Sequence, residues 1–120
     1  MQDTLNPRMD VGRFDHLLKL AGPTGGNVLL AQLEQDLGRN AAALAEAVAA
    51  DDRAAVRAAT HVLISVAGSV GADGLSADAR ALNEVAHGTE PLPAALAATI
   101  ADGIAALRAL VCRHRAMRPG

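Results

Sequence analysis

The stretch RAAVRAATHVLISVAGSV, residues 53–70, decides the fold of this chain. Its apolar residues recur alternately three and four positions apart, at Val56, Ala59, Leu63, Val66 and Val70. That spacing places them on one stripe of a helix. Asp51 and Asp52 come directly before the stretch, and either carboxylate can cap the helix. The stretch therefore predicts an amphipathic helix with one buried stripe.

The residues on the N-terminal side predict two more helices. A short one near residues 10–20 places Phe14, Leu17 and Leu18 on one side. The turn at residues 22–26 (GPTGG) ends it, because Gly and Pro are strong helix breakers. A long helix then runs to about Ala50, and its stripe is Leu30, Leu33, Leu37, Ala41, Leu44 and Val48.

The residues on the C-terminal side predict another two helices. After a break at residues 71–74 (GADG), the first carries Leu75, Ala79, Leu82 and Val85 as far as residues 87–88. Pro91 and Pro93 open the second, where proline is well tolerated. Its inner face is formed by Leu96, Ile100, Ile104, Leu107 and Val111.

Composition and connection length predict the architecture. The 120 residues form one domain, residues 1–120, with a core of about 10–116. Hydrophobic residues make up 51% and aromatic residues 1%, with 28 alanines, which favours helices over a sandwich or barrel. Short connections make neighbouring helices antiparallel. We therefore expect an all-α, up-down four-helix bundle with the short N-terminal helix as a lid.

Charge and cysteine content limit the classes of partner and compartment. The formal net charge is −2, and the single aromatic residue offers no stacking surface, so we expect no nucleic-acid partner. The sequence contains no run of 18 apolar residues, which a membrane span would need, and residues 1–10 do not resemble a signal peptide. Cys112 is the single cysteine, so no internal disulfide can form. We expect a cytoplasmic protein.

The helix of residues 53–70 also presents a face that the core does not need. His61 lies about 180° from the centre of the apolar stripe and should face solvent. The same face carries mainly small residues, namely Ala54, Arg57, Ala58, Ser65 and Gly68, with Ile64 on the flank. Small side chains allow another protein to approach closely, and we expect Ile64 to add apolar surface that the fold itself does not need. The alternative is that the alanines on this face reflect only the high alanine content of the chain, and that the exposed histidine has no special role.

From His61 onward, the string HVLISVAGSVGA resembles the histidine phosphotransfer (HPt) domain of phosphorelays. That family has the pattern His-x-Leu-Lys-Gly-Ser-Ala, then Leu-Gly-Ala, then Leu, Ala and Leu at helical spacing. The positions that match are His61, Leu63, Ala67, Gly71, Ala72, Leu75, Ala79 and Leu82. The resemblance covers about residues 14–112 and implies the same four-helix bundle.

The resemblance implies that His61 accepts a phosphoryl group from one receiver-domain aspartate and passes it to another. The expected partners are response-regulator receiver domains, a hybrid sensor kinase, or both. The receiver would supply Mg²⁺ and an acidic pocket, so no cofactor is expected on this chain. No ATP-binding motif is present, and a carrier that depends on its partners for catalysis is expected rather than an enzyme.

Two positions near His61 depart from the family pattern. Ile64 replaces a lysine that can neutralise phosphate, and Ser65 replaces a glycine while offering a hydroxyl donor. Arg57 could reach the phosphate from the preceding turn, or it could be an ordinary solvated arginine. The departures leave a second hypothesis open, a degenerate module that docks a receiver or kinase on Ala54, Ala58, Ile64 and Gly68 without being phosphorylated. A helical protein unrelated to phosphorelays would be favoured if His61 were buried.

The remaining chemical groups have simpler interpretations. His16, His87 and His114 lie in three separate segments without metal-ligand spacing, so we expect no metal site. We expect Cys112 to be buried or half-buried. A monomer is the expected state, with a homodimer through an exposed Ile64 as the alternative.

Overall fold

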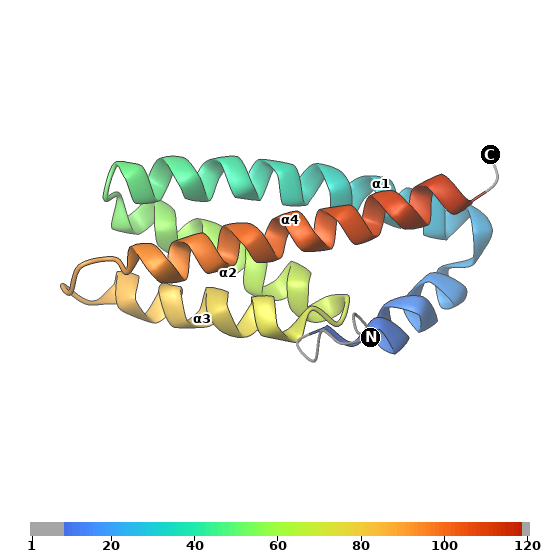
Figure 1. The fold of residues 1–120 in the computed structure, drawn as a ribbon, viewed down its shortest axis with the longest axis horizontal. Helices are drawn as coiled ribbons and strands as arrows, with labels where there is room; N and C mark the ends of the chain where they lie inside the picture. Colours follow the sequence, from blue (N-terminus) through green and yellow to red (C-terminus); the bar gives the residue numbers. More distant parts are fainter. Residues whose placement is uncertain (1–8, 119–120) are drawn as a thin grey trace.

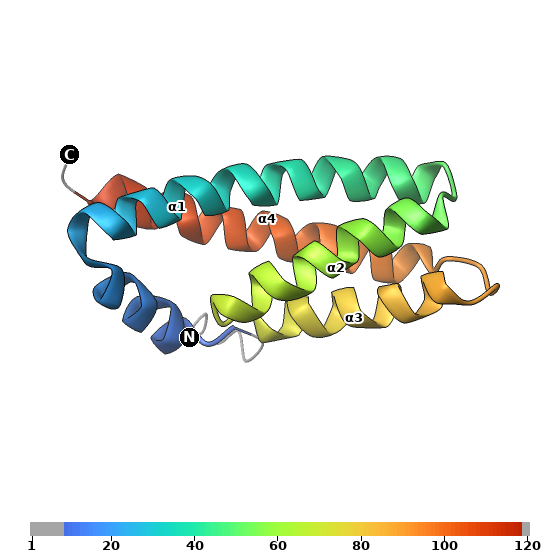
Figure 2. The ribbon, with the colours of Figure 1, turned by 180° about the vertical axis from the view of Figure 1, so that it is seen from behind.

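The computed structural model describes residues 9–118, which form four helices and no strand. The helices are α1 (Val11–Ala49), α2 (Arg53–Ser69), α3 (Asp73–His87) and α4 (Ala94–Met117). Each packs against the next, and α4 also packs against α1, which closes the bundle. Figures 1 and 2 show the four helices running in alternating directions along the long axis of the bundle. The predicted all-α bundle is confirmed.

A sharp kink at Gly22 divides α1 into two segments. The backbone there has φ 77° and ψ 178°, a left-handed conformation that suits glycine. Pro23 follows directly and opens the second segment, where its missing N–H costs nothing. The break therefore begins where the sequence predicted it but is confined to Gly22, because residues 23–26 are already helical. The first segment, residues 11–21, is called the lid below.

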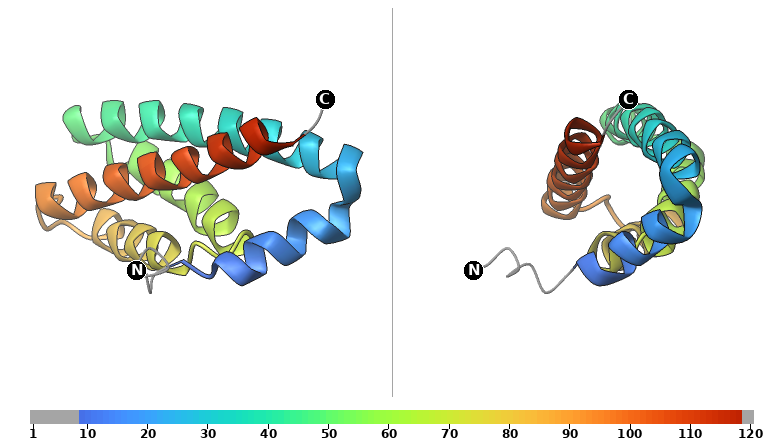
Figure 3. Two further views of the ribbon diagram at one scale, coloured as in Figure 1. Left: turned by 45° about the vertical axis from the view of Figure 1, so that its right-hand side comes forward. Right: turned by 90° about the vertical axis from the view of Figure 1, so that its right-hand side faces the viewer.

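The lid folds back across the end of the bundle (Figure 3). Phe14 is completely buried, and its ring meets the His114 ring of α4 edge-on, with the centroids 4.9 Å apart. Leu18 is also buried. At the start of the lid, the Asp10 N–H donates to the carbonyl oxygen of Gly71 at 2.8 Å. The lid is thus anchored to α4 at one side and to the α2–α3 turn at the other.

The buried stripes agree with the predicted ones except at their edges. On α2, Thr60 and Ala67 are buried and Val66 is half-buried, because α2 packs against α3 as well as α1. On α1, Asn40 and Ala47 are buried where the sequence suggested their neighbours Ala41 and Val48. The large side chains with less than 2% exposure include Phe14, Leu30, Leu37, Leu63, Leu82, Ile100 and Ile104.

The turns at the two ends of α2 rest on specific residues. Asp52 caps α2, accepting the Ala55 N–H on its side chain at 3.1 Å. Gly71 has φ 88°, and a Cβ there would lie 2.7 Å from the carbonyl oxygen of Asp10. Close contact between the lid and the α2–α3 turn therefore requires glycine at this position.

Helix α4 is the most apolar element of the described chain. Its 24 residues include an 18-residue window with a mean hydropathy of 1.7, long and apolar enough by those measures to cross a membrane. In this fold four of its large apolar residues, Ile100, Ile104, Leu107 and Val111, are buried against the other helices. Leu96 and Leu110 are half-buried, and Met117 is exposed. Alanine dominates the rest of the helix surface.

Candidate functional site

His61 lies near the middle of α2 with its side chain exposed to solvent. Ala54 and Ala58 precede it on the same face, and Ser65 follows one turn later; all three are exposed. Residues three, four and seven positions apart share a helix face, so these small side chains surround the imidazole. The result is a histidine that stands above a low, uncharged surface, which is called the α2 face below.

Three other predicted residues line the edge of the α2 face that adjoins α3. Arg57, Ile64 and Gly68 are all half-buried. Ile64 packs against the core, so the expectation that the fold does not need its apolar surface is wrong. The physical reason is its angle: Ile64 lies roughly 60° from His61 on the side that meets α3.

Arginines on α2 hold the C-terminal end of α3. Arg57 Nη1 donates to the carbonyl oxygen of Ala86 at 3.0 Å. Arg53 Nη1 donates to the carbonyl oxygens of Val85 and Gly88, at 3.1 and 2.9 Å. Cations favour the C-terminal end of a helix because its carbonyl groups lack intrahelical partners. These contacts join segments far apart in sequence, so the helix pattern alone did not reveal them.

Two hydrogen bonds between α2 and α3 flank His61. Asn83 Nδ2 donates to Thr60 Oγ1 at 2.9 Å, directly before the histidine. Ser76 Oγ donates to the carbonyl oxygen of Ile64 at 3.0 Å, three residues after it. Thr60 is completely buried. The turn that carries His61 is therefore fixed against α3 on both sides.

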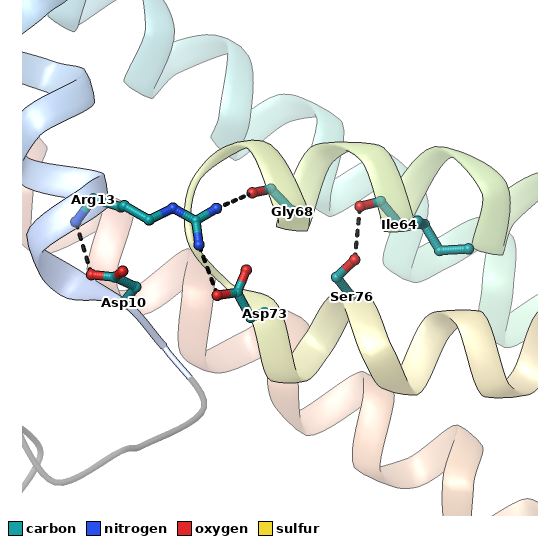
Figure 4. A network of polar contacts seen from close by, with 6 residues as sticks. All are labelled: Asp10, Arg13, Ile64, Gly68, Asp73 and Ser76. Carbon is teal, nitrogen blue, oxygen red and sulfur yellow. Dashed lines mark hydrogen bonds and ion pairs between the residues drawn. The ribbon is translucent and has the colours of Figure 1, made fainter.

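A polar network joins the lid to the C-terminal end of the α2 face (Figure 4). Arg13 of the lid donates to the carbonyl oxygen of Gly68 and to the Asp73 carboxylate, each at 2.8 Å. The Arg13 N–H donates to Asp10 Oδ1 at 3.0 Å. Arg13 was not predicted from the sequence, because nothing in a helical pattern indicates which distant carbonyl group an arginine will reach.

Val62 was also missed, although it directly follows His61. Its side chain is 49% exposed. The other large exposed apolar residues of the described chain lie on the lid, on α1 and at the end of α4, namely Val11, Leu20, Val28 and Met117. Val62 thus adds apolar surface to the α2 face on the side nearer α1.

The other histidines and the cysteine are scattered. His16 is exposed on the lid, His87 Nδ1 lies 2.8 Å from the carbonyl oxygen of Asn83, and His114 Nε2 lies 3.7 Å from Asp15 Oδ1. Residues 9–118 contain no group of three or more His, Cys, Asp or Glu side chains that could hold a metal ion. Cys112 is exposed on α4, so the expectation of a buried or half-buried thiol is wrong.

The geometry allows transfer of a group onto His61. A neutral imidazole nitrogen in solvent is a good nucleophile at physiological pH. Hydrolysis would also require an orienting group and an oxyanion site around the nucleophile. The small, uncharged residues of the α2 face supply neither, but they leave the ring open to a second protein.

Comparisons with known proteins address the fold and the family. A family model described as the Hpt domain matches residues 28–110. The crystal structure of histidine-containing phosphotransfer protein B (HptB) from Pseudomonas aeruginosa PAO1 has 23% sequence identity and a TM-score of 0.82, covering 95% of this chain and 99% of that one. At that identity the likeness establishes the fold. No curated protein sequence gives a significant match.

Proposed function

The chain belongs to the Hpt domain family, and we propose on that basis that His61 is its phosphoacceptor. The family functions in histidine phosphotransfer within phosphorelay signalling. Exposure of His61 in the middle of the α2 face is the observation that carries the proposal. An ordinary core histidine would be buried and hydrogen-bonded.

The proposed reaction is a reversible exchange with a receiver domain. An imidazole nitrogen of His61 attacks the phosphorus of a receiver aspartyl phosphate. The nitrogen–phosphorus bond forms as the bond to the aspartate oxygen breaks, and the carboxylate is the leaving group. Running the same steps backwards delivers the phosphoryl group to a second receiver. The receiver supplies Mg²⁺, and this chain supplies a positioned nucleophile without a cofactor of its own.

Residues around His61 have proposed supporting roles. Arg57 and Ser65 are the phosphate-side groups, each one turn from the histidine. Arg57 uses Nη1 to bind Ala86, but a guanidinium has five N–H donors and can serve a second acceptor. The receiver would dock on Ala54, Ala58, Ile64 and Gly68.

The same proposal includes the state of the protein in the cell. It acts as a cytoplasmic monomer that carries a phosphoryl group and depends on its partners for catalysis. A receiver domain, a hybrid sensor kinase, or both are the partners, with no role for nucleic acid or membrane. The absence of charge on the exposed part of the α2 face supports docking of a protein rather than of a polyanion.

The test is phosphoryl transfer from a panel of phosphorylated receiver domains, with His61→Gln as the control. We expect acid-labile, base-stable label on the wild type and none on the variant. Circular dichroism should show equal folding, because His61 is exposed. Binding to a receiver without any label would overturn the carrier role and favour a docking module that is not phosphorylated.

A further inference from the structure

The two hydrogen bonds between α2 and α3 also set the level of each residue along the bundle. On α2 they are made one residue before His61 and three residues after it. On α3 they are made by Ser76 and Asn83, and Arg80 lies between these two residues. Because α2 and α3 are antiparallel neighbours, Arg80 stands at the same level of the bundle as His61.

Arg80 also lies on the correct side of α3. Successive residues turn by about 100°, so Ser76 and Asn83 fall within about 20° of each other on the side that contacts α2. Arg80 is displaced by roughly 40° from Ser76 toward solvent, away from the buried Leu75 and Leu82. It is exposed. Arg80 therefore borders the junction of α2 and α3 on the outer surface, alongside the α2 face.

The guanidinium of Arg80 is not engaged within the fold. Arg13, Arg53 and Arg57 each donate to a backbone carbonyl group at the ends of α2 or α3. Within residues 9–118, by contrast, the Arg80 side chain makes neither a hydrogen bond nor an ion pair. An arginine at this level with no structural partner can bind an incoming anion without breaking a contact of the folded protein.

We propose that Arg80 supplies the positive charge that binds the phosphoryl group on His61, an inference that rests on the proposed function. Packed helices are about 8–10 Å apart, a distance that an extended arginine and an N-phosphoryl group can span together. The planar guanidinium matches two phosphate oxygens at once. Arg80 thereby takes over, from the neighbouring helix, the role that Ile64 cannot perform on α2.

The experiment compares Arg80→Ala and Arg80→Lys with the matched control Arg108→Ala. Arg108 is exposed on α4, diagonally across the bundle from α2. Stopped-flow or quench-flow transfer from a phosphorylated receiver would give the rate, and decay of isolated phosphoprotein would give the lifetime of the phosphohistidine. We expect Arg80→Ala to slow transfer by about tenfold and Arg108→Ala to leave it unchanged, since a charge-assisted hydrogen bond to phosphate has this effect. Arg80→Lys should retain most of the rate.

A rescue variant separates a phosphate contact from a structural effect. Adding Ile64→Lys to Arg80→Ala places a cation on α2 and should restore the rate. Equal rates for Arg80→Ala and Arg108→Ala, or a loss that neither lysine restores, would overturn the role of Arg80 while labelled His61 still supports the carrier function. A wild type without label at His61 would overturn both proposals.

Discussion

Arg57 and Ala86 are joined across the α2–α3 interface, with Nη1 of the arginine 3.0 Å from the alanine carbonyl oxygen. Arg57 lies one turn before His61, and Ala86 lies in the last turn of α3. The side chain proposed to contact the phosphate thus also ties the helix of the phosphoacceptor to its neighbour. The two roles can be separated by measurement.

Replacing Arg57 with alanine should lower both stability and transfer. We expect the free energy of unfolding to fall by about 1 kcal/mol, because a charged donor at a helix C-terminus is lost. If Arg57 also binds phosphate, transfer measured well below the melting temperature should fall as well. Denaturant unfolding and receiver assays check the two effects, with Arg39→Ala on the exposed side of α1 as the control. Unchanged transfer would leave Arg57 with a structural role alone.

The buried hydroxyl of Thr60 should contribute to stability out of proportion to its size. Thr60→Val keeps the shape but removes the acceptor for Asn83 Nδ2, at 2.9 Å. We expect a loss of about 1 kcal/mol in chemical denaturation. The matched control is Thr99→Val, because the Thr99 hydroxyl donates to the Ala95 carbonyl oxygen on an exposed face. Equal effects of the two substitutions would contradict the importance of the interhelical bond.

Restoring the family lysine at position 64 should separate binding from chemistry. We expect Ile64→Lys to transfer phosphate as well as the wild type or better, because lysine can neutralise phosphate oxygens. Ile64 packs against the core, so the variant should lose about 1 kcal/mol of stability. If neither the wild type nor Ile64→Lys takes up phosphate, and the variant binds the receiver less tightly, Ile64 belongs to a docking surface that has no chemical role.

Glycine at position 71 should be far less replaceable than glycine at position 12. Gly71→Ala would hold a side chain at φ 88° and place its Cβ 2.7 Å from the Asp10 carbonyl oxygen. We expect a loss of about 2 kcal/mol or more in thermal or denaturant unfolding. The comparison is Gly12→Ala, where the Cβ meets Asp10 Oδ1 at 3.4 Å within the lid helix. A Gly71→Ala protein as stable as Gly12→Ala would show that the lid can move away from the turn.

The bundle was predictable from sequence because large apolar residues recur at helical spacing in each helix and the breaks contain Gly, Pro or Asp. The stripes were less accurate at their edges: Asn40 is buried because its Nδ2 donates to the Ala59 carbonyl oxygen, at 2.9 Å. Helical periodicity cannot indicate such a partner on another helix. Periodicity along α2 was enough to predict the exposed position of His61. It could not predict the contacts of Arg13 and Arg57, because those are made with other segments.

The exposed thiol of Cys112 makes the proposed docking directly observable. The chain has one cysteine, and it lies on α4, diagonally across the bundle from the α2 face. A maleimide fluorophore would therefore attach at a single place and leave the surroundings of His61 unmodified. Anisotropy of that dye can follow receiver binding in wild-type protein and in every variant above, without an engineered labelling site.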